Sequence, residues 1–407
     1  MKTIALLITL DTKDQEAGYL IEQIRGRGHN PLLMDIGVVG SPGIEAHISR
    51  EQIADAGGRS LDDLLKNPTR EESGPVMVRG AINILLDRLA NNDLHAVLGL
   101  GGTQGTSSCC DIMQALPYGL PKIMVSTIAS GDTSGFVGIK DITMMFSVSD
   151  ILKLNPFTRK ILANAAAAAC GMAEVDITFK VEHGEKPLIG MSNLGVLTKG
   201  AMHAIAYIES KGYEVIVFHA VGSGGRAMEQ MMKEGIIGAV FDYAMGEIAD
   251  DVWSVLRAGG PERLTVAGKL GIPQVLCPGG AEHLGILVSP NEVPEEYKNH
   301  DYVFHSPVVF VPRLNADEIT RVAMSICDRL QYTSGKAKFL IPRGGVGRYS
   351  KIDGSLYDKE SDDAFFDYLI SHLPETVEIV DCPEYVEDPA FVERGVDLLI
   401  DMIESQK

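Results

Sequence analysis

The sequence has few cysteines and no long apolar run, and both absences narrow the class of protein. Six cysteines occur in 407 residues, without a Cys-x-x-Cys pair. A chain of this size does not need disulfides to hold its core, so we expect a reduced, cytoplasmic setting. The longest small, apolar stretch, Ile161–Ala173, contains Asn164 and falls short of the roughly 20 residues that span a bilayer. The opening run MKTIALLITL stops at Asp11 with no small-residue cleavage site, which favours a first strand over a signal peptide.

Basic residues are also scarce. The chain has 36 Lys and Arg against 55 Asp and Glu, which gives a net charge of −19. This balance argues against non-specific binding to nucleic acid and to anionic membranes, so neither is an expected partner. A local basic pocket for a phosphate is still compatible with it. Glycine, by contrast, is abundant at 43 residues, and its short clusters are typical of tight turns.

Short apolar runs alternate with amphipathic stretches along the whole chain. This pattern indicates mostly parallel sheets covered by helices. We therefore predict an α/β fold with two Rossmann-like domains, residues 1–183 and 184–407, and an interdomain cleft. The boundary is placed in the polar segment VEHGEK, where the apolar rhythm stops before it restarts.

The predicted elements of the first half include a helix whose start carries a capping box of Thr12 and Gln15. Its strands are expected at Thr3–Leu10, Pro31–Ile36, Ala96–Leu100, Lys122–Ser126 and Asp141–Phe146. Its helices are expected at Asp14–Gly28, Val76–Ala90, Thr106–Ala115 and Asn155–Ala173, with short helices in the polar residues 40–75.

The second half repeats the alternation. Its strands are expected at Pro187–Ser192, Glu214–Ala220, Ile236–Phe241, Gln274–Cys277, Val308–Val311, Lys338–Ile341 and Val377–Val380. Its helices are expected at Lys199–Lys211, Arg226–Glu234, Pro261–Leu270, Ala316–Leu330, Asp362–His372 and Pro389–Glu404.

Polar residues and glycines gather where the strands of the first half end. Ligands of open α/β sheets bind beyond these carboxyl ends. The loop Gly101–Ser107 combines close-approaching backbone amides, hydroxyls and a helix amino end, which is the chemistry of an anion site. It matches neither the GxxxxGK[ST] P-loop nor GxGxxG, and the alternative interpretation is a tight strand-to-helix turn. The residues predicted to bind the nucleotide are Asp11, Thr12, Lys13, Gly101, Gly102, Thr103, Gln104, Gly105, Thr106, Ser107, Ser130, Gly131, Asp132 and Thr133.

Within this set, Ser130–Thr133 is a second candidate for phosphate or metal. Asp11 and Asp132 are the predicted ligands of a Mg²⁺ ion that bridges phosphates, because Mg²⁺ prefers carboxylates together with phosphate oxygens. Lys13 would neutralise phosphate charge. The alternative for Asp132 is an Asx turn.

A second glycine motif lies in the other half. Gly222, Gly224 and Ala227 match GxGxxA after a predicted strand, and Asp242 follows 20 residues after Gly222. This spacing is that of a dinucleotide fingerprint, with Asp242 on the ribose. Arg226 could instead pair with a phosphate or a carboxylate. The residues predicted to bind a second substrate here are His219, Gly222, Ser223, Gly224, Gly225, Arg226, Arg343, Gly344 and Gly345.

Other titratable groups follow the strands of this half. His219, Glu282 and His283 are candidates for acid/base or metal chemistry, although histidines near turns are commonly only hydrogen-bonded. Cys277 is a candidate nucleophile, and the alternative is a buried small hydrophobe. The adjacent Cys109 and Cys110 are expected in the core. No catalytic residue is assigned.

Four segments together resemble a known family: LLITLDTKDQEAGYL, VLGLGGTQGTS, VSTIASGDTSGFVG followed by DITMMFSVSDILKLN, and FHAVGSGGRAME. They are similar to a bacterial uncharacterised protein family that is itself similar to the ATP-binding amino-terminal region of the plant tomato mosaic virus resistance protein. The resemblance covers nearly the whole chain. It implies an ATP-binding, two-domain α/β protein that forms homodimers. In the plant relatives a TIM-barrel-like domain follows this unit, so a separate TIM-barrel partner is a further hypothesis.

Three functions stay open at this point. The preferred one is an ATP-binding protein, with Mg²⁺ as a possible companion, that uses ATP on a small-molecule substrate in the cleft. The second is an NAD-dependent oxidoreductase that uses the motif at Gly222–Ala227. The third is a nucleotide-sensing protein without enzymatic activity, so whether the chain is an enzyme is left undecided.

Overall fold

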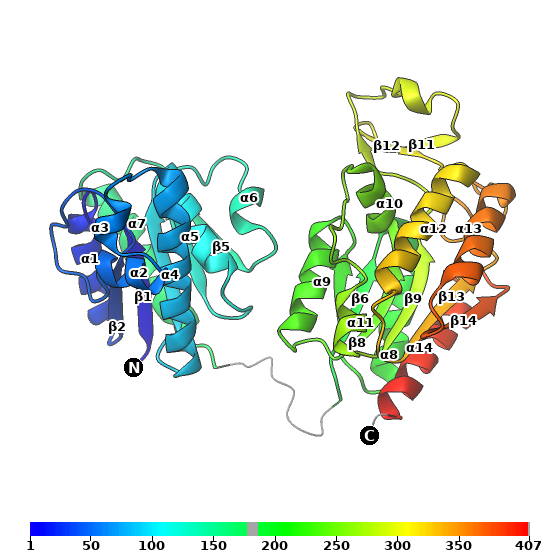
Figure 1. Cartoon of the computed structure of the whole chain (residues 1–407), viewed down its shortest axis with the longest axis horizontal. Coiled ribbons are helices and arrows are strands. Elements are labelled where there is room, and N and C mark those ends of the chain that lie inside the picture. Colours follow the sequence, from blue (N-terminus) through cyan, green and yellow to red (C-terminus); the bar gives the residue numbers. More distant parts are fainter. Residues whose placement is uncertain (177–185, 406–407) are drawn as a thin grey trace. The chain divides into compact units, whose positions relative to one another are not determined.

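The computed structural model describes residues 1–176 and 186–405, and the chain divides into two compact units, residues 1–179 and 180–407 (Figure 1). Each unit is an α/β domain with its own parallel sheet, as predicted. The predicted boundary between residues 183 and 184 lies outside the described residues. No helix in the described ranges has the length and apolar character needed to cross a bilayer.

The sheet of the first unit has five parallel strands in the order β2-β1-β3-β4-β5. The predicted strands are confirmed to within two residues at each end. They are β1 (Thr3–Ile8), β2 (Asn30–Asp35), β3 (Ala96–Gly101), β4 (Lys122–Ser126) and β5 (Ile142–Phe146). The helices are α1 (Asp14–Arg25), α2 (Arg50–Ala56), α3 (Leu61–Leu64), α4 (Arg70–Ala90), α5 (Thr103–Gln114), α6 (Ser134–Val137) and α7 (Pro156–Ala173).

Helices cover both faces of this sheet. Successive residues of a strand point to opposite faces, so each strand presents apolar side chains to both layers of helices. In β1, Ile4 packs with α1 and α7, whereas the next residue, Ala5, packs with α2, α4 and α5. Figure 1 shows α4 lying beside α5. Cys109 and Cys110 are buried in the second of these layers, as expected.

The sheet of the second unit has six parallel strands in the order β14-β13-β9-β8-β6-β7. They are β6 (Ile189–Asn193), β7 (Val215–His219), β8 (Ala239–Ala244), β9 (Gln274–Gly279), β13 (Ala337–Pro342) and β14 (Val377–Cys382). A small antiparallel sheet is added by β10 (Ile286–Leu287), β11 (Tyr302–Ser306) and β12 (Val309–Pro312). The sequence analysis anticipated only β12 of these three strands.

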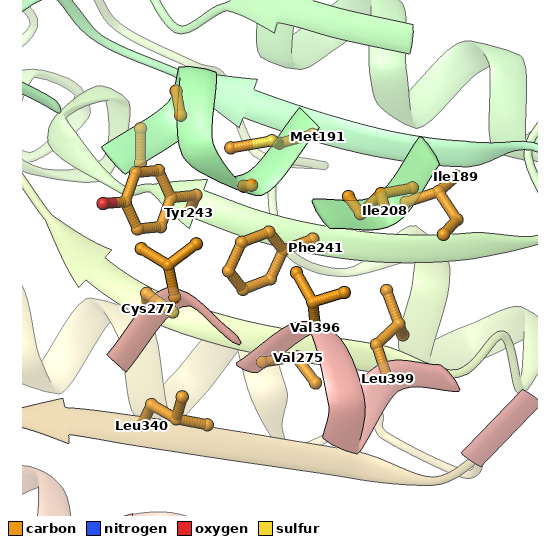
Figure 2. Packing of buried hydrophobic residues seen from close by; sticks show 14 of the residues in the cluster. Ile189, Met191, Ile208, Phe241, Tyr243, Val275, Cys277, Leu340, Val396 and Leu399 are labelled. Carbon is orange, nitrogen blue, oxygen red and sulfur yellow. The ribbon is translucent and has the colours of Figure 1, made fainter. Parts of the chain in front are cut away.

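The helical segments of the second unit cover both faces of its large sheet. They are η1 (Gly195–Leu197), α8 (Thr198–Ser210), α9 (Ser223–Lys233), α10 (Gly246–Trp253), α11 (Val266–Leu270), η2 (Glu295–Tyr297), α12 (Ala316–Leu330), α13 (Lys359–His372) and α14 (Pro389–Glu404). Figure 2 shows the core on the side of α8 and α14, where Phe241 and Tyr243 of β8 stack with ring centroids 5.4 Å apart. Val396 and Leu399 of α14 belong to the same cluster. The opposite face packs against α9 to α13.

The starts of several helices, and the cap of α1, differ from the predictions. The capping box of Thr12 and Gln15 is wrong, because α1 is preceded by Lys13 and no side chain caps it. The helices α5 and α9 both begin three residues earlier than expected, directly after Gly102 and Gly222. The earlier starts bring the glycines of both motifs to helix amino ends. Helix α10 was not predicted.

Candidate functional site

The candidate site of the first unit lies where its sheet changes winding direction. In the order β2-β1-β3-β4-β5, the chain leaves β1 towards one edge and β3 towards the other, and ligands of such sheets bind at this switch point. A pocket of about 490 Å³ opens there. Its lining includes residues that follow three strands and residues of the first turns of α4. They are Thr9 and Asp11–Lys13 after β1, Ile36–Val39 after β2, and Gly101–Gly105 at the end of β3.

The amino end of α5 supplies the donors of this pocket. The first N–H groups of a helix have no acceptor within the helix. No side chain in the described ranges caps α5, and its first turn contains no acidic residue. Thr103, Gln104 and Gly105, which make up this turn, all line the pocket. A side chain at Gly101 would place its Cβ 2.7 Å from Cα of Gly105, so the tight approach of strand to helix requires glycine.

Two cations and one carboxylate line the same pocket: Lys13, Arg70 and Asp11. Lys13 is buried, and its Nζ donates to the carbonyl of Ile151 at 2.9 Å. An ammonium group has three donors, so this bond leaves two for another acceptor. Arg70 and Asp11 are exposed. The lining therefore carries a net positive charge in a protein whose total charge is −19.

A buried ion pair fixes the wall that follows β2. Asp35 and Arg50 are 1% and 4% exposed, and Nε of Arg50 donates to Asp35 Oδ2 at 2.8 Å. Nη1 of Arg50 also donates to the carbonyls of Val39 and Gly40, at 2.9 and 3.1 Å. Oδ1 of Asp35 accepts the N–H of Leu10 at 3.2 Å. One ion pair thus holds the loops after β1 and β2 together.

Several predicted residues lie elsewhere. Thr106 is buried, and its hydroxyl is 2.7 Å from that of Ser126, so it is not a phosphate donor in this arrangement. Ser107 is exposed and lines an adjoining pocket. Ser130–Thr133 is not part of the lining either. Asp132 accepts the N–H of Ser134 at 2.9 Å, and this bond holds the pKa of its carboxyl below the usual value. The Asx-turn alternative is therefore correct for Asp132, and the pocket does not bring it to Asp11.

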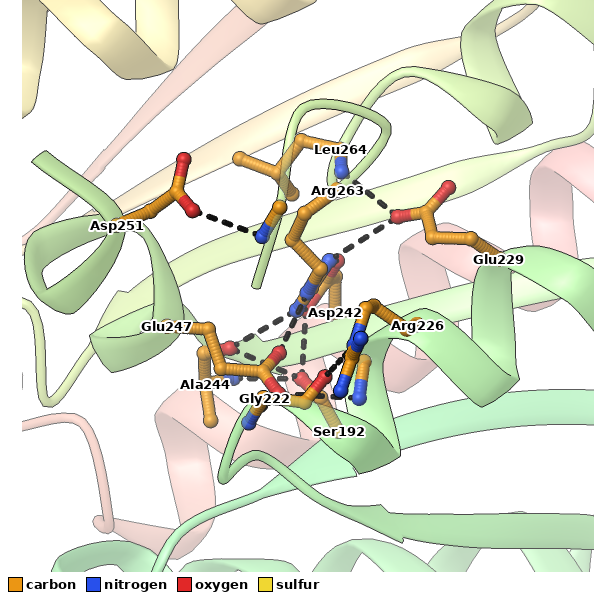
Figure 3. A network of polar contacts seen from close by, with 12 residues as sticks. Ser192, Gly222, Arg226, Glu229, Asp242, Ala244, Glu247, Asp251, Arg263 and Leu264 are labelled. Atoms are coloured by element: carbon orange, nitrogen blue, oxygen red, sulfur yellow. Dashed lines mark hydrogen bonds and ion pairs between the residues drawn. The ribbon is translucent and has the colours of Figure 1, made fainter. Parts of the chain in front are cut away.

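The glycine motif of the second unit is closed by the protein itself (Figure 3). Oε1 of Glu247 accepts the N–H of Gly222 at 2.6 Å and that of Gly225 at 3.0 Å. Glu247 is fully buried in the first turn of α10. A Cβ at Gly225 would lie 1.9 Å from Oε2 of Glu247, so glycine is required for the carboxylate to approach. The amides predicted to bind a substrate anion already donate to the carboxylate of Glu247.

The role of Asp242 on a ribose is contradicted by the structure. Asp242 is 2% exposed and accepts from Nη2 of Arg263 at 2.6 Å and from the Ser192 hydroxyl at 2.6 Å. Nε of the same arginine donates to Glu247 at 2.7 Å, and Nη1 lies 3.4 Å from Glu229. Burial raises the pKa of Glu229 to about 7, against the opposing effect of Arg263. The fingerprint spacing therefore belongs to a buried ion network.

The other residues predicted for the second unit fall into separate places. Nε of Arg226 donates to the carbonyl of Gly222 at 3.2 Å. Arg343 makes two bonds of 2.9 Å to Asp381, which lower the pKa of that carboxyl. Gly344 and Gly345 form a turn, with N–H of Gly344 bonded to the carbonyl of Glu384 at 3.1 Å. Of the predicted substrate set, only His219 lines the second unit's own pocket after β6 and β7.

Cys277 is fully buried, and burial raises the pKa of its thiol well above the usual value. A nucleophile needs the thiolate, so the hydrophobic alternative for Cys277 is correct.

Comparison with known proteins follows the same division of the chain. The model of the N-terminal domain of an uncharacterised protein family, UPF0261, matches residues 2–178, and that of its C-terminal domain matches residues 186–403. This chain belongs to the UPF0261 family. A UPF0261 protein of Clostridium tetani is 38% identical over 99% of both chains. The ToMV resistance protein Tm-1(GCR237) of Solanum lycopersicum is 30% identical over 77% of this chain and 42% of its own length.

Among solved structures, a putative UDP-N-acetylglucosamine 2-epimerase from Listeria monocytogenes is similar at 11% identity and a TM-score of 0.24, over 68% of this chain and 79% of that one. A TM-score of this size carries no argument about the activity of the UPF0261 chain.

The sequence analysis missed Arg70, the second cation of the pocket in this UPF0261 chain. It placed the start of α4 at Val76, six residues too late. A signal was available, because Thr69 and Glu72 have the spacing of a helix amino-terminal cap, and the Thr69 hydroxyl accepts the N–H of Glu72 at 3.4 Å.

Proposed function

We propose that this UPF0261 chain binds ATP through its first unit, with the triphosphate at the amino end of α5. The observation that carries the proposal is an uncapped helix start, free of acidic residues, in a pocket at the switch point of a parallel sheet. Lys13 and Arg70 add positive charge to the same pocket. The family resemblance noted from the sequence supports a nucleotide as the ligand.

Mg²⁺ would accompany the nucleotide through Asp11. Asp11 is the one carboxylate among the described lining residues, and Mg²⁺ commonly uses one or two protein carboxylates together with phosphate oxygens and water. Asp132 has no part in this arrangement. Binding should therefore be tighter for Mg·ATP than for ATP in the presence of a chelator.

The use of the bound nucleotide defines two variants of the proposal. An enzyme would consume ATP on a small-molecule substrate, whereas a sensor would bind ATP without turnover. The NAD alternative loses its support, because Asp242 and the amides of Gly222 and Gly225 are engaged inside the protein. The homodimer and the separate TIM-barrel partner stay predictions of the family resemblance.

Calorimetry with ATP, ADP, NAD and NADP, each with and without Mg²⁺, tests the proposal. We expect Mg·ATP to bind and the dinucleotides not to bind. Binding of NAD without binding of ATP would contradict the proposal. Tight ATP binding with no release of ADP or phosphate, alone or with a metabolite panel, would favour the sensor.

A designed cap tests the location. Gly102 precedes α5 in an extended conformation, and a Cβ there would meet only the Thr127 hydroxyl, at 3.8 Å. In Gly102→Asp the new carboxylate should accept the first N–H groups of the helix. We expect ATP affinity to fall at least about 30-fold while thermal stability is kept. Gly102→Ala, which adds no acceptor, should bind ATP like the parent chain. Unchanged binding by Gly102→Asp would place the triphosphate elsewhere.

A further inference from the structure

A pocket of about 390 Å³ lies within the second unit, beyond the carboxyl ends of β6 and β7 and beside the small antiparallel sheet. This volume is in the lower part of the range of small-molecule sites. Much of its wall is apolar, and the side chains that form this part are Leu194, Val196, Val221, Leu256, Val309 and Val311. It is separate from the nucleotide pocket proposed above, and the inference below does not rest on that proposal.

Arg257 is the cation of this pocket. It is 6% exposed, and Asp250, which is fully buried, holds Nε at 2.9 Å and Nη2 at 2.8 Å. Nη2 also donates to the carbonyl of His283 at 3.0 Å. Nη1 has a weaker contact, a distance of 3.4 Å to Nε2 of His283. The guanidinium is therefore fixed in direction, and Nη1 is the part of it left with donor capacity.

His283 is fixed in a similar way. It is 2% exposed, and its Nδ1 lies 3.2 Å from Oε1 of the fully buried Glu282. Its ring packs edge-on against Tyr349, with centroids 6.0 Å apart. Nδ1 thus faces Glu282, and Nε2 faces Arg257. Tyr349 in turn has its hydroxyl 3.3 Å from Nδ1 of His305, another residue of the pocket wall.

Arg257 is the one permanently charged side chain among the described lining residues of this pocket. The described lining residues include Arg257 and three histidines, but no aspartate or glutamate, although acids outnumber bases 55 to 36 in the chain. The two carboxylates nearest to these groups, Asp250 and Glu282, are buried and engaged behind them. An anionic group entering the pocket would meet no aspartate or glutamate among the described lining residues.

We infer that this pocket binds a small organic carboxylate with an apolar body. The body would lie against the valine and leucine side chains, and the carboxylate would accept from Nη1 of Arg257. A phosphate ester is disfavoured, because the nearby helix amides that would receive it, at Gly222 and Gly225, are occupied by Glu247. Nη1 of Arg257 offers a charged donor, and a carboxylate oxygen is a strong acceptor for such a donor.

Calorimetry on the full chain tests this with benzoate and hexanoate as probes, and with benzamide and hexanamide as neutral analogues of matched shape. We expect both acids to bind at least about tenfold more tightly than their amides. Equal binding of acid and amide would overturn the charge argument. Failure of both acids to bind at millimolar concentration would overturn the site.

Two variants fix the location. Val309→Trp should fill the pocket from β12 and reduce the affinity for benzoate at least about tenfold. Leu270→Trp, at a 53% exposed position of α11 outside the pocket, should leave binding unchanged. Retained binding in Val309→Trp, with the variant folded by circular dichroism, would place the acid elsewhere. Loss of ATP binding at Gly102→Asp has no bearing on this result, since the two pockets lie in different units.

Discussion

The two units share a strand order but treat equivalent helix starts in opposite ways. In each, the third strand along the chain lies beside the first, and a helix follows it: α5 after β3 and α10 after β8. The second residue of the helix is Gln104 in one unit and Glu247 in the other. Glu247 turns back onto the glycine motif and fills it, whereas the start of α5 stays open. The same fold thus places a buried carboxylate against helix amides in one half and an uncapped helix start beside a pocket in the other.

This comparison predicts that Glu247 is a folding residue. Glu247→Ala leaves two buried N–H groups and Nε of Arg263 without their acceptor, and removal of one partner of a buried pair costs about 3–5 kcal/mol. Urea unfolding followed by Trp253, the only tryptophan and a residue of the second unit, measures it. The exposed Glu262→Ala is the control and should change the stability by less than about 0.5 kcal/mol. A similar small effect of Glu247→Ala would show that the motif does not need its carboxylate.

The second expected effect is a pH dependence of the stability of the second unit. Burial raises the pKa of Glu229 from 4.5 to about 7, and that of Asp362 from 3.8 to about 7. A raised folded-state pKa gives stability that is complete below the unfolded-state value and is lost as the pH rises through about 7. For Glu229 the span corresponds to about 3 kcal/mol.

Urea unfolding by Trp253 fluorescence between about pH 5 and about pH 8 should therefore show falling stability. Glu229→Gln should reduce this slope, and the slope that stays should belong to Asp362. A stability of the second unit that rises over this range, in the parent chain, would refute the assignment.

A transplanted charge gives the third and smaller effect. Gln104→Glu places an acid in the first turn of α5, at the position that Glu247 occupies in α10. Because Gln104 is exposed, the variant should fold normally, and repulsion should weaken ATP binding by about tenfold at low salt. Gln104→Ala is the control for the lost amide. Equal ATP affinities of the two variants, measured by calorimetry, would show that the phosphates do not bind at this helix end.

The smallest expected effect concerns Arg70, the first residue of α4. Arg70→Ala should weaken ATP binding by about fivefold, and less at high salt, because the side chain is exposed and its attraction is screened. Arg27→Ala, an exposed cation after α1 and outside the pocket, should not change the affinity. Equal losses in both variants would indicate a general effect of net charge.

The regular strands could be predicted because their apolar residues are continuous and each run ends at polar or glycine residues. The loop Gly101–Gly105 was recognised on the same basis. Helix α10 was missed because Glu247 and Asp250 are charged yet fully buried, so they interrupt the apolar pattern by which helices are recognised. Strand β11 was missed because none of its five residues is fully buried, so it lacks the apolar run of a core strand.

The error about Asp242 has a different physical origin. The motif at Gly222–Ala227 and the spacing to Asp242 met the rule for a dinucleotide site. The rule assumes that the amides and the carboxylate face solvent, whereas Arg263 and Glu247 bury them in this fold. Such pairing depends on tertiary contacts between loops, which local spacing does not encode. The same holds for Lys13, whose bond to Ile151 joins residues 138 positions apart.

Because the start of α5 is uncapped, the stability of the first unit should depend on whether a ligand is bound there. When the pocket is empty, only water can meet those donors, and a ligand present at about a thousand times its dissociation constant would add about 4 kcal/mol of resistance to unfolding. In the second unit the carboxylate of Glu247 already accepts the corresponding amides, so the nucleotide should not change the stability of that unit. If the proposed nucleotide binds at α5, loss of the nucleotide should lower the protease resistance of the amino-terminal half and leave that of the carboxy-terminal half unchanged.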